Sequence, residues 1–214
     1  MKRTCLALAL LVTLSAPARA GDYLQADPKT FDLDGAKRIR IEFPIGKFTL
    51  EGDDGQTVRV QVRVDCKDED YEDCKDEARR IRVDHSAGGG QFRLEFSGIR
   101  RDWSGHHVSV EAHVLVPRSI AAEVNMGVGK ADVIGMRRDL DLELGVGEMS
   151  VRAQQADFRN VEAEAGVGDA AIETREGRVR ERGFIGHSAR WSDGGGANSI
   201  RVHVGVGQAT VDLR

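Results

Sequence analysis

The feature that most constrains the fold is a repeat in which the apolar alternation changes phase at a glycine. In the segment LDLELGVGEMSV, Leu140 and every second residue up to Val146 share one face of a strand. After Gly147 the apolar positions shift by one residue, to Met149 and Val151. A period of two is typical of a β-strand with one buried face. A glycine at the phase shift indicates a bulge or a corner.

The same pattern recurs along the chain at a nearly regular spacing and predicts an all-β fold. Short regular repeats usually bury their apolar faces by stacking on one another. We therefore expect a β-solenoid, a β-helix-like repeat array, over 119–214, with an antiparallel β-sandwich as the alternative. The copy at Gly186 is degenerate, because Ser188 and Arg190 occupy positions that are apolar elsewhere. The predicted corners are Gly46, Gly129, Gly147, Gly168, Gly186 and Gly207.

The region 21–118 is also rich in predicted strands and is expected to continue into the repeats as one domain. Alternating runs cover 37–52 and 57–64, and the turn residues Asp53, Asp54 and Gly55 between them predict a hairpin. Two further runs, 81–83 and 92–96, flank a glycine loop and predict a strand pair, and another strand is expected over 107–116.

The segment 1–20 has the pattern of a signal peptide. Lys2 and Arg3 precede an apolar run, and Ala18 and Ala20 form an A-x-A cleavage site before Gly21. We expect an exported protein, in the periplasm or at the cell surface, with an N-terminal membrane anchor as the alternative. The apolar run is too short to span a bilayer, and no later stretch is long enough.

Two cysteines remain after cleavage, Cys66 and Cys74. In an oxidising compartment we expect them to form a disulfide; two free thiols or half of a metal site are the alternatives. Cys66 directly precedes the helix predicted over about 67–80, and Cys74 lies within it. This helix is acidic at its start and ends in arginines. Calcium is the alternative use of its acidic residues, but the spacing of a calcium-binding loop is absent.

Composition argues against a nucleic-acid partner. The whole chain has a formal net charge of −4. Cleavage after Ala20 removes Lys2, Arg3 and Arg19 and no acidic residue, so the mature chain is more acidic still, at −7. Neutralising phosphates requires a basic surface, which this composition does not favour.

Stacking the copies on their corner glycines predicts columns of outward-facing charges. One column is an acidic ladder that could hold a cation such as calcium, and a second column is a basic strip of opposite charge. The alternative is an ordinary solvated face of mixed charge. The ladder comprises Asp141, Glu143, Glu162 and Glu164, and the strip comprises Arg180, Arg182 and Arg201. Trp191, in the degenerate copy, is either a contact residue or a packing residue.

No recognised nucleophile, zinc or phosphate-loop motif occurs in the sequence. The Val-Gly repeats at 128–129, 146–147, 167–168 and 206–207, behind a signal peptide and an acidic helical insert, resemble a large bacterial family of putative adhesins. The resemblance implies β-helix-like head domains and a non-enzymatic binding or scaffolding role in the cell envelope, with a protein or glycan partner. It supplies no catalytic residues and no cofactor.

The alternative function is a small β-helix enzyme that acts on acidic polysaccharide with calcium, using carboxylates such as Asp141 and Glu162. The terminal strand over 199–213 could also pair with a second copy and form a homodimer.

Overall fold

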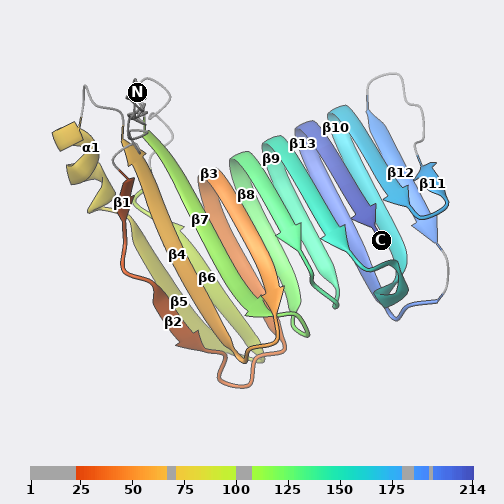
Figure 1. Cartoon of the computed structure of the whole chain (residues 1–214), viewed down its shortest axis with the longest axis horizontal. Helices are drawn as coiled ribbons and strands as arrows, with labels where there is room; N and C mark the ends of the chain where they lie inside the picture. The colour runs from red at the N-terminus through yellow and green to blue at the C-terminus, as the bar shows by residue number, and fades with distance from the viewer. Residues whose placement is uncertain (1–22, 67–70, 100–107, 180–185, 193–194) are drawn as a thin grey trace, which may run out of the picture.

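The computed structural model describes residues 23–66, 71–99, 108–179, 186–192 and 195–214. Within these ranges the chain is nearly all β, with one α-helix and one 3-10 turn (Figure 1). The elements are β1 (Tyr23–Gln25), β2 (Lys29–Asp32), β3 (Arg38–Asp53), β4 (Thr57–Cys66), α1 (Tyr71–Ala78), β5 (Arg82–Gly88), β6 (Gln91–Ser97), β7 (Val108–Pro117), β8 (Ala121–Ile134), β9 (Leu140–Ala153), η3 (Gln155–Asp157), β10 (Phe158–Thr174), β11 (Gly177–Val179), β12 (His187–Ser192) and β13 (Asn198–Leu213).

Five long strands form the centre of one mixed sheet. They lie parallel and in register in the spatial order β3, β8, β9, β13, β10 (Figure 1). Shorter strands extend the sheet at both ends, and most of them pair antiparallel. Because the central strands carry the repeats, equivalent positions of neighbouring strands are register partners across the sheet.

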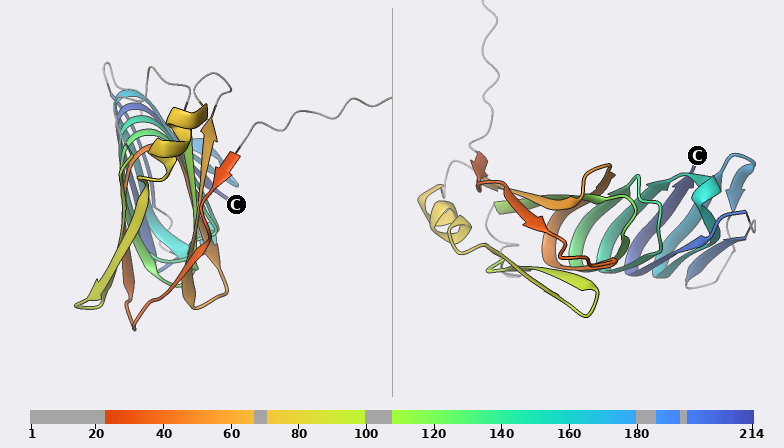
Figure 2. Two further views of the ribbon diagram at one scale, coloured as in Figure 1. Left: turned by 90° about the vertical axis from the view of Figure 1, so that its left-hand side faces the viewer. Right: turned by 90° about the horizontal axis from the view of Figure 1, so that it is seen from below.

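Each long strand bends at its corner glycine, so its two halves lie in two layers that face each other (Figure 2). The first half of β3 pairs with β6, whereas its second half pairs with β7. At the other end of the stack, β12 continues the first half of β10 and β11 continues the second half. The first layer, formed by the first halves of the long strands, thus faces a second layer formed by their second halves.

The apolar alternation places the core between the two layers. In β9, Leu140, Leu142 and Leu144 from the first half and Met149 from the second half are all at most 2% exposed. Val146, which the alternation assigns to the same face as the leucines, is instead 47% exposed. That prediction is wrong because the bend begins at this residue and turns its side chain outward.

A close backbone approach explains the glycine at each bend. Gly147 has a φ of 139°, and a Cβ there would lie 1.8 Å from the carbonyl oxygen of Gly129 in the neighbouring strand. No side chain fits at that distance, and L-residues rarely adopt that φ. Gly186 is not a corner of this kind, because it precedes the antiparallel strand β12 and lacks a positive φ. The bend glycines with a positive φ are Gly46, Gly129, Gly147, Gly168 and Gly207.

The order of the strands differs from the order of the repeats. The terminal strand β13 lies between β9 and β10 and hydrogen bonds with both. The expectation that it pairs with a second copy is therefore wrong, because both of its edges are occupied. Asn198 fixes its start, since its side-chain amide donates to the carbonyls of Arg137 and Asp157, each at 2.9 Å.

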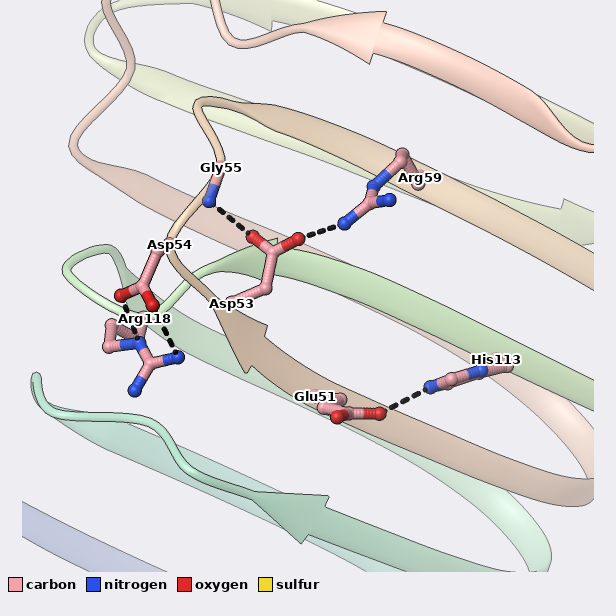
Figure 3. Close-up of polar contacts among 7 residues, drawn as sticks. All are labelled: Glu51, Asp53, Asp54, Gly55, Arg59, His113 and Arg118. Atoms are coloured by element: carbon pink, nitrogen blue, oxygen red, sulfur yellow. Dashed lines mark hydrogen bonds and ion pairs between the residues drawn. The ribbon is translucent and has the colours of Figure 1, made fainter.

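The predicted hairpin between β3 and β4 is also wrong, because β7 lies between them. The turn itself forms: the Gly55 N–H donates to Asp53 Oδ1 at 2.8 Å, and Asp53 also pairs with Arg59 (Figure 3). Arg118, which follows β7, lies 2.9 Å from Asp54. These contacts hold in place the turn that links β3 to β4 across the end of β7. The predicted pair formed by β5 and β6 is confirmed.

The disulfide between Cys66 and Cys74 is present, with the two Cα atoms 5.9 Å apart, and both residues are buried. It joins the end of β4 to α1, which lies within the predicted helical range 67–80; residues 67–70 lie outside the described residues. The described part of the chain contains no helix with the length and apolarity needed to cross a membrane.

We expect Gly147→Ala to lower the free energy of unfolding by about 3 kcal/mol or more, because the new Cβ collides with a backbone carbonyl at a strained φ. Urea denaturation followed by circular dichroism measures the change. Gly88→Ala is the control, since a Cβ at Gly88 meets nothing within 4 Å. Equal stability of the two variants would contradict the explanation of the corner.

We expect Cys66→Ser with Cys74→Ser to lower the free energy of unfolding by about 2–3 kcal/mol, because the disulfide closes a short loop in the unfolded chain. The same denaturation experiment measures it. Dithiothreitol should reduce the stability of the natural chain by a similar amount and leave that of the double variant unchanged. A double variant that is still sensitive to the reductant would contradict this interpretation.

Candidate functional site

A groove crosses the outer surface of the first layer next to the bend. Its volume is about 620 Å³, and it is lined by residues of β6, β3, β8, β9 and β13. The polar side chains along it are Arg40, Glu42, Glu95, Asn125, Glu143 and His203. Five adjacent strands thus contribute to one continuous surface that runs across the sheet.

The groove is hollow because its floor lacks large side chains. Pro44, Gly127, Gly145 and Gly205 line it, each one residue before the apolar residue at the bend. A Cβ at Gly145 would lie 2.6 Å from the carbonyl oxygen of Gly127. The close stacking of the strands therefore excludes larger residues and leaves the outer surface open at this row.

Beside the groove lies an exposed apolar row, which we call the valine ridge: Val128, Val146, Val206 and Val167. The four residues are register partners on β8, β9, β13 and β10, and are 38–53% exposed. Among the described residues they are the large hydrophobic side chains that are exposed. With strands about 4.8 Å apart, the ridge extends about 15 Å. Sequence reasoning missed it, although the glycines on both sides of each valine mark the positions.

Acidic and basic side chains intermix on the outer face of the first layer. Across the sheet, one column reads Arg40, Glu123, Asp141, Arg201, Glu162 and Arg190. Arg40 pairs with Glu123 at 2.8 Å, and Arg190 pairs with Glu162 at 2.6 Å. Within the described chain, Asp141 and Glu143 form no ion pair. Glu143, which lines the groove, is thus available to a ligand, whereas Asp141 lies outside the lining.

The observed strand order separates the acidic pairs of the predicted cation ladder. Arg201 lies between Asp141 and Glu162, and His203 lies between Glu143 and Glu164. The pairs are two strands apart, about 9.6 Å between backbones, and so do not form the adjacent column that the ladder requires. The same separation applies to Asp141 and Glu162 as an enzymatic carboxylate pair. In the part of the chain that the structure describes, no three His, Cys, Asp or Glu side chains are grouped as metal ligands.

The other predicted contact residues are dispersed. Arg201 is exposed in the first layer, whereas Arg180 and Arg182 lie outside the described residues. Trp191, on β12, is half-buried against the core. It also lines a hollow at the far end of the stack together with Glu176, whose pKa is lowered chiefly by a hydrogen bond with the Thr174 side chain.

The second layer carries a smaller hollow of about 320 Å³ at β3, β4 and β7. Four of its polar and charged side chains form pairs within the chain: His113 Nε2 lies 2.9 Å from Glu51 Oε2 (Figure 3), and Lys47 Nζ lies 2.7 Å from Glu111 Oε1. The groove of the first layer is therefore the stronger candidate, because it is larger and keeps the unpaired carboxylate of Glu143 beside an exposed apolar row.

No family model matches the chain, and no curated protein matches its sequence. Solved structures do resemble it. A protein of Clostridium sporogenes, described as a putative cell adhesion protein, has a TM-score of 0.53 at 14% identity, over 90% of this chain and 100% of the other. A putative adhesin of Bacteroides fragilis has a TM-score of 0.31 at 10% identity, over 92% and 99% of the two chains. The likeness to the Clostridium protein shows that the two chains share a fold.

Proposed function

We propose that this chain is an exported, non-enzymatic binding module that holds an extended cell-envelope partner in the groove and on the valine ridge. The observation that carries the proposal is the in-register row of four exposed valines beside a groove that contains the unpaired carboxylate of Glu143. The shared fold with a protein described as a putative cell adhesion protein supports the same class of function.

The chemistry of the surface suits a long, partly polar chain. Glu143, Asn125 and His203 supply hydrogen-bond acceptors and donors in one row, while Val146 and Val206 supply apolar contacts in the next. Both rows repeat at the spacing of the strands, about 4.8 Å. A polymer lying across the strands can therefore make the same contact several times, which suits a glycan or an extended peptide better than a compact metabolite.

The repeat stack supports a scaffolding role in the same proposal. The five long strands act as rungs of a solenoid-like array whose outer faces are presented to the partner. The signal-peptide pattern over 1–20 and the disulfide both favour an exported location.

We expect Val146→Ser with Val206→Ser to weaken binding to isolated cell envelopes at least tenfold. Each valine buried by a partner contributes about 1.5–3 kcal/mol, and about 1.4 kcal/mol corresponds to a factor of ten. Sedimentation of the purified chain with envelope fragments measures the apparent Kd. The matched control is Gln208→Ser, an exposed position on β13 two residues after Val206. Unchanged binding by the double variant would exclude the ridge as the contact surface.

We expect protease treatment of intact cells to remove the mature chain while a periplasmic marker survives, because an adhesin-like module must reach its partner outside the cell. Blotting both proteins measures the outcome, and lysed cells provide the control for protease sensitivity. Survival of the chain together with the marker would place it in the periplasm and contradict this expectation.

A further inference from the structure

The core is divided into two clusters at the N-terminal end of the stack. A small cluster contains Val64, Cys66 and Cys74, with Ala78 and Ile81 packed on it. The main core begins on the other side of a hollow of about 370 Å³. The hollow lies where β4, in the second layer, and β5, in the first, have no central strand to fill the space between them. Its apolar lining comprises Ala26, Val60, Val62, Val64, Ala78, Ile81 and Val83.

Two features keep the walls of this hollow in place. The disulfide attaches α1 to the end of β4. On the opposite side β2 crosses between the layers, where Lys29 Nζ donates to the carbonyl oxygen of Val83 at 3.3 Å. Further toward the core lies Phe31, which contacts His85 and Phe92, with ring centroids 4.3 and 6.2 Å apart. The hollow is thus bounded by a covalent and a polar contact, and the aromatic cluster lies beyond its lining.

The charged residues at this hollow are mostly cationic, although the chain as a whole is acidic. Among the residues that the structure describes, Lys29, Lys75 and Arg79 line it, together with one acid, Asp27. Arg79 forms an ion pair with Asp76 at 2.8 Å, and both side chains are 67% exposed. Exposed pairs of this kind contribute little, so the guanidinium can turn toward a bound anion at small cost. Apolar walls with a cationic margin are complementary to a molecule with one hydrocarbon chain and one anionic head.

We propose that this hollow binds a single-chain fatty acid, with its hydrocarbon chain against the valines of β4 and its carboxylate beside Lys29 and Arg79. The volume falls within the range of ordinary ligand sites, about 300–1,000 Å³. The hollow shares no lining residue with the groove, so the proposal is independent of the proposed function.

The test titrates the purified full chain with laurate, with dodecanol, which has the same chain length without the charge, and with butyrate, which has the charge without the long chain. We expect laurate to bind tightest and to shift the methyl resonances of Val60, Val62 and Val83 in NMR spectra. Equal affinity for laurate and butyrate, or methyl shifts confined to other parts of the core, would overturn the proposal.

Variants test separately the recognition of the carboxylate and the recognition of the hydrocarbon chain. Lys29→Gln with Arg79→Gln should weaken laurate binding about tenfold and leave dodecanol binding unchanged, whereas Lys130→Gln, on the second layer, should affect neither. Ala78→Phe should fill the hollow and abolish both. If that variant does not fold, Val62→Met, a smaller enlargement, should still weaken both ligands. Charge variants that leave laurate affinity unchanged, or a folded filled variant that still binds laurate, would overturn the proposal.

Discussion

The structure depends on how closely the backbones approach one another at the bends. Five strands stack in parallel, and at each bend the carbonyl oxygen of one strand occupies the space that a Cβ of the next would need. The approach is possible because the residue that faces the carbonyl is glycine and has no Cβ; at Gly46 that carbonyl belongs to Val110 of β7. Once the bends are aligned, the register of the whole stack follows, because a slip of one residue would oppose a glycine to a valine and invert the buried faces. The groove floor depends on the same constraint, since its glycines also pack against neighbouring carbonyls.

The local pattern of the sequence is sufficient to predict the long strands, the disulfide and every bend glycine, although it wrongly includes Gly186, because each depends on residues close together in the chain. The alternation in β9 and the corner at Gly147 are examples. The order of the strands is not predictable in this way. Every copy presents the same inward face, so β13 fits beside β9 as well as β10 would. The choice is made by loop contacts, such as those of Asn198 with Arg137 and Asp157, which no periodic pattern reveals.

In the candidate site too, the features set by residues close together in the chain could be predicted, and those set by the pairing of distant strands could not. The identities of Asp141, Glu162 and Arg201 as outward residues could be predicted from the alternation. Their neighbours could not, because a change of strand order converts an acidic ladder into an interleaved row of charges. The exposure of Val146 could not be predicted from periodicity either. The alternation places it inside, and only the bend, which displaces the chain locally, turns it out.

The degenerate copy has a structural role that its departures from the repeat explain. Strand β12 pairs antiparallel with β10, so it presents neither a corner glycine nor a parallel edge to a further rung. At the other end, α1 and its disulfide cover the end of β4. The ends of a stacked array must differ from its repeats, because an end identical to a repeat would pair with further copies without limit. The loss of the pattern around Gly186 therefore ends the parallel stack, and the valine ridge ends with the last parallel strand, β10.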